Sequence, residues 1–562
     1  MSIQDPTIVT PLRTQARRAI ERAWEQAVSV GALPAVPDGV EPPAIEIERP
    51  GNPEHGDLAS NIALKLARPL RRPPPAIAEV IVEQLRTIED APIATAAVAP
   101  PGFINLTLAD TALEELVAAV LWSPESWGRV APIRPRRVNV EFVSANPTGP
   151  LTIGNARGAF IGDLLGRVLA AGGQEVTREY YFNDAGGQIT NLGASIVALR
   201  QGEPIPEDGY HGAYVEDLVA RLPAETWDAA TAPGADAAEV VGHWAAGVVR
   251  EGIEASLERL GVHFDVWTTE ASLHEQGWVE RAVDRLREHG HVYEQDGALW
   301  FQSTTFGDDK DRVILRSNGQ PTYFAADIGY VAEKFSRGFD HLIYIWGADH
   351  HGTVARVRNA ASAMGYDVER VQMLLYSWVR FVRDGVEVSM SKRAGEFITL
   401  DELLAEVGVD AARWFFASRA ATTGIDFDIE LAKRQSADNP VYYVQYAHAR
   451  IASILRKAGH AGLEPAPSVT GLLAGAPEAT LARALARLPE VVEDAVLAEE
   501  TQGVTSYATE LATTFHAFYR DARVVDASAP DRSRARLALA LATKTTLANA
   551  LGLLGISAPE SM

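Results

Sequence analysis

The stretch Val138-Asn-Val-Glu-Phe-Val143, followed by Asn146-Pro-Thr-Gly-Pro-Leu-Thr-Ile-Gly-Asn155, decides the fold of this chain. It passes from an apolar segment into a turn rich in glycine and proline, and a helix is expected to open at Ala156. Strand, tight turn and helix in this order are typical of a nucleotide site in a Rossmann-type sheet. In such a site the backbone passes close to a phosphate, and exposed helix N–H groups face the anion.

A second stretch far along the chain, Val388-Ser-Met-Ser-Lys-Arg393, presents two cations that are expected to close on the same phosphates. Together the two stretches predict that ATP is used for adenylation, with a basic loop stabilising the pyrophosphate leaving group. Each is a short pattern. Taken alone, the first is equally compatible with a plain turn between a strand and a helix, and the second with a solvated surface loop.

Composition limits the possible chemistry. The chain has 562 residues, enough for several domains, and it lacks cysteine, which excludes disulfides, cysteine-ligated zinc, iron–sulfur clusters and thiol nucleophiles. The formal net charge of -23 argues against a nucleic-acid partner, because phosphate binding requires clustered lysine and arginine. A large enzyme can nevertheless be acidic overall and basic along one groove, and an acidic balance also suits a cationic substrate.

The beginning of the chain, Met1-Ser-Ile-Gln-Asp5, lacks the basic-then-apolar plan of a signal peptide. Apolar runs stay short of the roughly 20 residues that span a bilayer. A cytoplasmic protein with no membrane attachment is the expectation.

Changes in pattern predict three domains. Residues 1–128 are expected to form a small N-terminal α+β domain. Residues 129–430 are expected to form a Rossmann-type nucleotide-binding catalytic domain of the α/β class, with a helical insertion at about 192–290. Residues 431–562 are expected to form a C-terminal all-α helix bundle.

Within the catalytic domain, short apolar segments alternate with helical ones from Arg137 onward, which predicts a parallel sheet with crossover helices. After Thr399 the pattern is almost entirely helical. The segments expected as strands are 138–143, 176–182, 299–302, 313–315 and 341–345.

These motifs carry a family resemblance. Residues 146–158 resemble the first signature of class I aminoacyl-tRNA synthetases, usually His-Ile-Gly-His, and residues 389–393 resemble the second, usually Lys-Met-Ser-Lys-Ser. Within that class the chain resembles arginyl-tRNA synthetases nearly from end to end. The supporting stretches are Glu54-His-Gly-Asp-Leu-Ala-Ser-Asn61, Pro101-Gly-Phe-Ile-Asn105, Asn183-Asp-Ala-Gly-Gly187, Tyr323-Phe-Ala-Ala-Asp-Ile-Gly329, Asn439-Pro-Val-Tyr-Tyr-Val-Gln-Tyr-Ala-His-Ala-Arg450 and Leu551 to Met562.

The resemblance assigns the ATP site. It implies catalytic roles for Thr152, Asn155 and Lys392, and Mg²⁺ is expected to arrive with ATP, which acts as a substrate. Two positions depart from the first signature: Thr152 and Asn155 replace its two histidines, and Thr152 cannot carry an imidazolium charge. Ser389 replaces the first lysine of the second signature. The residues implied to bind ATP are Pro150, Thr152, Gly154, Asn155, Met390, Ser391 and Lys392.

A pocket for the amino acid is implied by two acids, Glu141 inside an apolar strand and Asp327 in an apolar stretch. A carboxylate in a buried run must be paired, and the ordinary alternative is an internal arginine or a helix cap. The resemblance instead assigns both to the guanidinium of arginine, which suits planar bidentate recognition. It further implies that Ser144 and Asn146 bind the head group, that Tyr323 forms the pocket wall and that His350 completes the site.

His350 lies in Asp349-His-His351, a pattern that also occurs at metal sites. Without further clustered ligands, no metal site and no zinc are expected, and a histidine pair at a sheet edge is the alternative.

The implied RNA contacts lie at both ends of the chain. Tyr443, Tyr446 and Arg450 are expected to meet the anticodon, because aromatic rings beside a cation suit stacking on unpaired bases. Packing inside a helix bundle is the alternative for each ring. Asn105 resembles a position that touches the tRNA elbow.

The implied reaction is attack by the arginine carboxylate on the α-phosphorus of ATP, followed by transfer of the arginyl group to the terminal adenosine of tRNA(Arg). The resemblance adds that tRNA binds before the adenylate forms, and a monomer is expected. Three alternatives stay open: an adenylating nucleotidyltransferase without RNA, an RNA-binding paralogue that has lost catalysis, and a synthetase for another amino acid. The long helical region after Thr399 disfavours the first, Lys392 the second and the paired acids the third.

Overall fold

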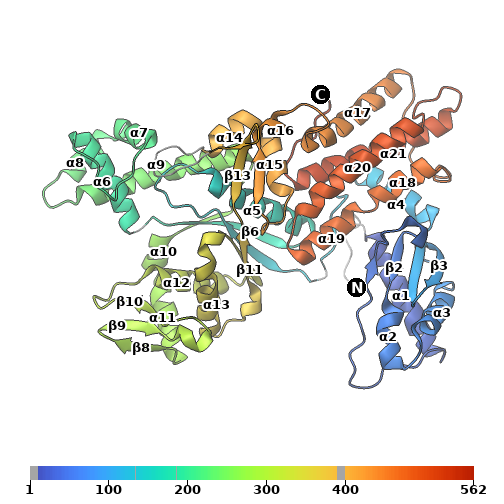
Figure 1. Cartoon of the computed structure of the whole chain (residues 1–562), viewed down its shortest axis with the longest axis horizontal. Coiled ribbons are helices and arrows are strands. Elements are labelled where there is room, and N and C mark those ends of the chain that lie inside the picture. The colour runs from blue at the N-terminus through green and yellow to red at the C-terminus, as the bar shows by residue number, and fades with distance from the viewer. Residues whose placement is uncertain (1–9, 133, 185, 389–398) are drawn as a thin grey trace.

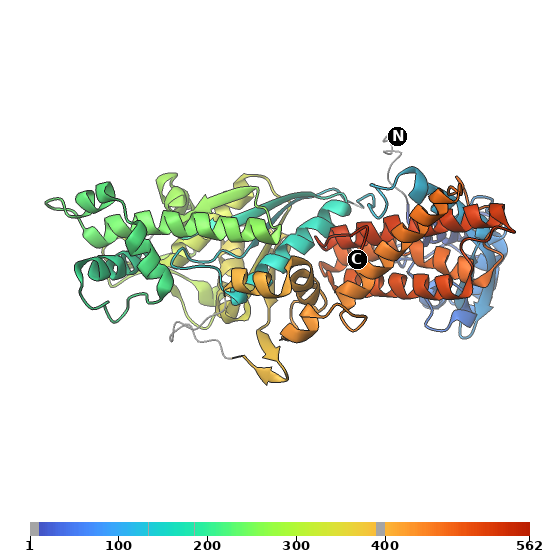
Figure 2. The same ribbon diagram turned by 90° about the horizontal axis from the view of Figure 1, so that it is seen from above.

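The computed structural model describes residues 10–132, 134–184, 186–388 and 399–562. Three regions follow one another along an elongated molecule (Figure 1). The N-terminal region packs under the C-terminal helices at one end, a parallel sheet occupies the middle, and a helical excursion extends to the other end. The view from above shows the same order (Figure 2).

The N-terminal region is an antiparallel sheet with helices on one face. The sheet has the order β1-β2-β4-β3, and along β4 buried side chains alternate with half-buried ones, as expected for a strand with one face on a core. The helices are α1 (Leu12–Ser29), α2 (Ile62–Leu70), α3 (Pro74–Leu85) and α4 (Asp110–Trp122), and the strands are β1 (Ile47–Glu48), β2 (Leu58–Ser60), β3 (Ile93–Ala99) and β4 (Phe103–Leu108).

The central sheet is parallel throughout and has the order β12-β11-β5-β6-β7. Helix α5 (Ile153–Ala171) connects the middle strand, β5, to its neighbour β6 and is buried along most of its length. This is the predicted α/β architecture, and the strand–turn–helix predicted at 138–156 forms as β5, a turn and α5. The strands are β5 (Arg137–Phe142), β6 (Glu175–Phe182), β7 (Val266–Thr269), β11 (His341–Gly347) and β12 (Val371–Tyr376).

The predicted insertion at about 192–290 is not wholly helical. Strand β7 lies inside it and forms the sheet edge beside β6. The helices before β7 form the excursion seen at the far end of the molecule (Figure 1). The helices around β7 are α6 (Gly187–Gln201), α7 (Ala213–Arg221), α8 (Ala224–Ala230), α9 (Ala237–Leu260), α10 (Glu270–Glu275) and α11 (Trp278–Glu288).

The expectation that 299–302 and 313–315 belong to the parallel sheet is wrong. They form β9 (Ala298–Phe301) and β10 (Arg312–Leu315), which pair antiparallel with each other. Together with β8 (Val292–Gln295) they make a separate three-stranded sheet. A short apolar run reveals a strand but not its direction or its partner, since both depend on contacts far along the chain.

Two further helices of the catalytic region are α12 (Tyr323–Ser336), which carries Tyr323 and Asp327, and α13 (His351–Ala363), which follows His350. After them comes a small sheet with the order β14-β13-β15, in which β13 (Val379–Arg383) and β15 (Ile425–Asp428) are parallel. Strand β15 therefore corrects the expectation of an almost wholly helical chain after Thr399. The remaining elements here are β14 (Val386–Glu387), α14 (Leu400–Val407), α15 (Val409–Ala417) and α16 (Ile429–Lys433).

The C-terminal region is a helix bundle, as predicted. Helix α17 packs against α20 and α21, and α18 packs against the same two helices. The helices are α17 (Pro440–His460), α18 (Ala476–Leu485), α19 (Leu488–Ala498), α20 (Gln502–Asp521) and α21 (Pro530–Leu553). Over the described residues, every helix is too short or too polar to cross a membrane.

Candidate active site

The turn that leaves β5 holds two residues in an unusual backbone conformation. Val143 has φ of 69° and Ser144 has φ of 43°. Positive φ is rare outside glycine, and for the β-branched Val143 it is a marked outlier. Such strain persists where the surroundings impose it, commonly at ligand sites. The turn places Ser144 back over β5, where its hydroxyl donates to Glu141 Oε1 at 3.1 Å and accepts from the backbone N–H of Tyr181 at 3.2 Å.

Glu141 points into the space between β5 and α12. Its other oxygen, Oε2, accepts from Lys334 Nζ at 2.6 Å, and both side chains are almost fully buried. The sequence-based alternative of an internal cation partner is therefore partly right, although the partner is a lysine. Lys334 also lies over the rings of Tyr330 and Tyr344, at 4.3 and 3.9 Å from their centroids. Removing one member of such a buried pair leaves the other charge unsatisfied.

Asp327 lies one turn after Tyr323 on α12 and is half-buried. Among the described residues it has neither a cation nor a hydrogen-bond donor as partner. Burial, and then the negative charges of Glu141 and Glu270, raise the pKa of Asp327 to about 8. The site therefore gathers negative charge that it does not neutralise by itself.

Glu270, which opens α10, is a third acid that the sequence analysis did not single out. It is buried, and Tyr181 donates its hydroxyl proton to Glu270 Oε2 at 2.9 Å. Burial raises the pKa of Glu270 above its usual value. Its position directly after the Val266–Thr269 strand, at the carboxyl end of a parallel sheet, is the one signal that would have marked it.

The other predicted pocket residues lie around the opening of this acidic cluster. Asn146 is exposed. Tyr323 is 54% exposed, and its hydroxyl approaches Gly186 so closely that a Cβ there would lie 3.1 Å away. His350 is exposed beyond the end of β11, where its ring lies 5.7 Å from that of Trp346. Its Nε2 stands 3.8 Å from Asp349, and no group of three or more potential metal ligands occurs among the described residues.

At the phosphate end, the two positions that replace the signature histidines bond to each other. Asn155 Oδ1 accepts from the Thr152 hydroxyl at 2.8 Å and from the Thr152 backbone N–H at 3.3 Å. The proton of Thr152 is thus already used, while the amide N–H₂ of Asn155 bonds to no other described residue. Gly154, between them, is exposed, and a Cβ built there would meet no protein atom nearer than 3.6 Å. Pro150 is half-buried just before them.

The fold connects the second signature to this turn. Met390, Ser391 and Lys392 lie outside the described residues, which resume at Thr399. Leu400 N–H donates to the Leu151 carbonyl at 3.0 Å, and Thr399 forms an isolated antiparallel bridge with Thr152. Thr399 and Leu400, which follow the second signature in the sequence, are therefore bonded to residues of the first.

The predicted RNA contacts form an aromatic surface on α17 and α20. Tyr446 is 40% exposed and stacks with Tyr442 at 6.3 Å and 8°. Arg450 lies over the rings of Tyr446 and Tyr519, at 5.7 and 4.4 Å. The rings are therefore not simply core filling.

Tyr443 lies on the same surface and is held in place by α20. Its hydroxyl donates to Thr513 Oγ1 at 3.3 Å, and its ring lies 5.0 Å from His516. At the other end of the molecule, Asn105 is half-buried in the middle of the N-terminal sheet, paired with Ala59 and Ala97.

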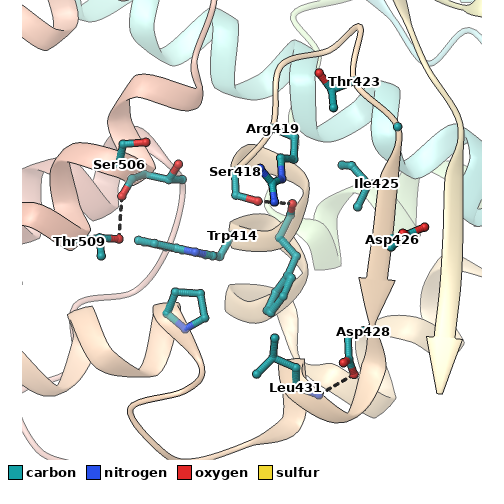
Figure 3. A pocket seen from close by; sticks show the side chains of 14 residues that line it. Trp414, Ser418, Arg419, Thr423, Ile425, Asp426, Asp428, Leu431, Ser506 and Thr509 are labelled. Atoms are coloured by element: carbon teal, nitrogen blue, oxygen red, sulfur yellow. Dashed lines mark hydrogen bonds between the residues drawn. The ribbon is translucent and has the colours of Figure 1, made fainter. Parts of the chain in front are cut away.

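A cavity of about 630 Å³ lies apart from this acidic site. It opens between α15, β15 and α20, with Trp414 in its middle (Figure 3). Ser418 and Thr423 line one side, and Ser506 and Thr509 line the other. None of the residues predicted for substrate binding lines it.

Comparison with known proteins identifies first the class and then the family. A family described as "tRNA synthetases class I (R), catalytic domain" matches residues 243–421. One described as "Arginyl tRNA synthetase N terminal domain" matches residues 14–108, and "DALR anticodon binding domain" matches residues 444–562. The parallel sheet, the strand–turn–helix at its centre and these matches together define a class I aminoacyl-tRNA synthetase.

Curated relatives identify the family within this class. The arginine–tRNA ligase of Frankia alni is 46% identical over 97% of this chain and 99% of its own length. That of Citrifermentans bemidjiense is 44% identical over 98% of this chain and its full length. The solved arginyl-tRNA synthetase of Thermus thermophilus is 26% identical, with a TM-score of 0.75 over 97% of this chain and the whole of that one. The chain belongs to the arginine–tRNA ligase family, whose members use ATP, arginine and tRNA.

Proposed function

We propose that the three acids beside β5 and α12 hold the guanidinium group of L-arginine, with Asp327 as its principal partner. The supporting observation is that Asp327 stands without a cation or donor among the described residues, next to Glu141 and Glu270. A guanidinium offers five donors in a plane and a permanent charge, so it can meet several carboxylates at once. This unpartnered carboxylate is the observation that carries the proposal.

Glu141 contributes in a different way. Both of its oxygens are bound, to Lys334 and to Ser144, but each oxygen has a second lone pair that can accept from the substrate. Lys334 also neutralises one of the three acids when all are ionised. Three ionised acids and one lysine leave two negative charges, which attract the guanidinium cation and disfavour a neutral or anionic side chain.

The head group of arginine is proposed to lie at the strained turn. Ser144 donates its proton to Glu141 and accepts from Tyr181, which leaves one lone pair for the substrate's ammonium group. Asn146 has an exposed amide that can bind the carboxylate or the ammonium group. Tyr323 is proposed as the wall over the aliphatic stem, and His350 as a contact at the opening.

ATP is proposed to bind at the start of α5, with its phosphates near Gly154 and Pro150. The space above Gly154 supports this, because no contact within the protein demands a glycine there. Asn155 is proposed to donate its amide N–H to a phosphate, and Thr152 to hold Asn155. Met390, Ser391 and Lys392 are proposed to act on the same phosphates. Mg²⁺ is proposed to arrive with ATP and to need few protein ligands.

In the proposed reaction, a carboxylate oxygen of arginine attacks the α-phosphorus of ATP. A new O–P bond forms, the bond to the bridging oxygen breaks, and pyrophosphate leaves. The 2′-hydroxyl of the terminal tRNA adenosine then attacks the arginyl carbonyl and releases AMP. Positioning and charge stabilisation carry the rate, so no protein nucleophile is needed.

The RNA partner is proposed to be tRNA(Arg), which binds before the adenylate forms. Its anticodon would stack on Tyr443 and Tyr446 beside Arg450, and its elbow would contact Asn105. The enzyme is proposed to work as a monomer in the cytoplasm.

A direct test compares arginine with citrulline and lysine in tRNA-dependent AMP release. Citrulline has the shape of arginine but a neutral urea in place of the guanidinium, and lysine has the charge without the planar fork. We expect AMP release with arginine alone. Charging with citrulline at a rate near that of arginine would overturn the role of the acids. Omitting tRNA should abolish pyrophosphate exchange, and robust exchange without it would contradict the binding order.

A further inference from the structure

Arg157, on the second turn of α5, has an arrangement that the reaction above does not use. It is two residues beyond Asn155, and its side chain is fully buried. The guanidinium forms no ion pair with any described residue. It donates instead to four backbone carbonyls: those of Ser377 at 2.7 Å, Trp378 at 3.0 Å, Ala420 at 3.1 Å and Thr423 at 2.6 Å.

These carbonyls belong to two separate segments. Ser377 and Trp378 join β12 to β13, whereas Ala420 and Thr423 lie in the turn before β15. The two strands that follow are parallel neighbours, with Val379 opposite Ile425. Arg157 therefore ties the start of α5 to the common base of β13 and β15. Thr423 also lines the cavity beside α20, so the turn has open space on its far side (Figure 3).

A neighbouring residue strengthens the same connection. Tyr376, the last residue of β12, donates its hydroxyl proton to the Gly154 carbonyl at 3.3 Å. Its ring lies so close to Gly158 that a Cβ there would stand 3.0 Å away. The first two turns of α5 are thus fixed to the segment around 376–378.

Arg413 provides a comparison within the same molecule. It is also fully buried and also donates to backbone carbonyls, those of Leu554 and Leu260, but it pairs with the carboxylate of Asp163. Arg157 has no such anion among the described residues, and burial lowers its pKa to about 10. A buried charge without a counterion is unfavourable, and an apolar side chain would fill the space without that penalty. The presence of a guanidinium here therefore points to a need for its hydrogen bonds to the four carbonyls.

We propose that Arg157 is a positioning residue for adenylate formation. It fixes the first turn of α5, which presents its N–H groups to the ATP phosphates, at a set place relative to β13 and β15. The inference rests on the proposed phosphate site at that turn. A shift of about 1 Å at a reacting group can lower a rate on the order of 10²-fold, so loss of the clamp should slow chemistry while the arginine pocket stays intact.

The test pairs Arg157→Lys with Arg413→Lys, because each variant keeps a charge but loses the guanidinium fork. The assay is arginine-dependent pyrophosphate exchange with tRNA present, normalised to active sites, together with thermal unfolding. We expect Arg157→Lys to lower kcat on the order of 10²-fold with arginine KM within about twofold. Arg413→Lys should lower the midpoint of unfolding at least as much, yet leave kcat within about threefold.

Two results would overturn the inference. In the first, Arg157→Lys loses thermal stability but keeps its kcat per active site. In the second, it raises arginine KM as strongly as it lowers kcat, which would place the damage in the amino-acid pocket. A wild-type enzyme inactive with arginine would instead contradict the proposed function, so the two failures are distinguishable. Arg157→Met, which removes the charge as well, should lower kcat at least as much as the lysine variant.

Discussion

The acidic pocket and the phosphate end lie on either side of one turn, yet they are built in opposite ways. The pocket holds acidic groups in fixed places before any substrate binds: Glu141 is bonded to Lys334, Glu270 is bonded to Tyr181, and Asp327 lies near both acids. The phosphate end consists of neutral side chains, and Thr152 and Asn155 spend part of their hydrogen-bonding capacity on each other.

This difference separates selection from catalysis. A preformed cluster of acids can reject neutral and wrongly shaped amino acids without moving, because its carboxyl groups are already in position. A neutral phosphate end offers little stabilisation of its own beyond N–H groups, so the positive charge for the leaving pyrophosphate must come from elsewhere. We expect changes in the pocket to alter arginine KM, and changes at the phosphate end to alter kcat.

The largest effect is expected for Asp327→Asn. Its amide cannot pair with the guanidinium as an ion, and loss of a charge-assisted partner corresponds to about 3–4 kcal/mol, or on the order of 10²- to 10³-fold in arginine KM. The measurement is arginine KM in tRNA-dependent pyrophosphate exchange. An unchanged KM would remove Asp327 from the pocket.

Glu141→Gln separates binding from stability in the same pocket. The change leaves Lys334 buried without its anion, which is expected to lower the free energy of unfolding by about 3–5 kcal/mol. Asp327→Asn should leave that free energy unchanged or raise it, since it relieves repulsion among acids. Denaturant unfolding of both variants provides the comparison. Equal losses of stability in the two would contradict the different pairing of these acids.

Asn155→Ala tests the phosphate end. Removing one donor from a transition-state oxyanion costs on the order of 10²-fold in kcat. We expect that loss with little change in arginine KM, measured in the same exchange assay. If KM rose and kcat stayed constant, the two regions would not be functionally separate.

The pocket should also respond to pH. The folded-state pKa of Asp327, about 8, lies above its ordinary value of 3.8, so the empty folded enzyme holds a proton that the unfolded chain has lost. Between pH 4 and 8 this group therefore destabilises the fold increasingly as pH rises. Arginine binds the ionised form, so its affinity should increase up to about tenfold per pH unit from pH 6 to 8 and then level off. Calorimetric titration of the enzyme checks this, and Asp327→Asn should flatten the profile.

The smallest effect is expected for Thr152→Val. Its hydroxyl proton is directed at Asn155 rather than toward the site of the phosphates, so kcat should fall less than about fivefold, the loss of one neutral hydrogen bond. Single-turnover adenylation measures it. A loss as large as that of Asn155→Ala would mean that Thr152 acts on the phosphate directly.

The sequence predicted local features well because they depend on neighbours in the chain. Residues 138–156 form a strand, turn and helix as expected, since apolar alternation and turn residues are local signals. Lys334 could not be predicted as the partner of Glu141, because 193 positions separate them. The placement of 299–302 and 313–315 in the parallel sheet failed for a related reason: four-residue runs carry no information about strand direction.

The site shows the same limit. Catalytic roles were predicted for both Asn155 and Thr152, but their mutual hydrogen bond depends on the first turn of α5 forming a cap. Glu270 stands in an ordinary polar stretch, and only the return of its strand to the sheet edge brings it to Tyr181, 89 positions earlier. The assignments of individual substrate contacts therefore stay predictions until the variants are measured.

The N-terminal region is fastened to the helical bundle rather than to the central sheet. Arg13 reaches Glu493 at 2.6 Å, Arg49 reaches Glu490 at 2.9 Å, and Arg483 on α18 reaches Asp57 at 2.7 Å. These ion pairs, together with the packing of α4 on α18 and α21, hold the surfaces that carry Asn105 and α17 at a fixed distance from each other. An RNA that contacts both surfaces must have the length that this distance requires. This selection by length would be independent of the amino acid bound at the central sheet. It would weaken at high salt, which screens the ion pairs.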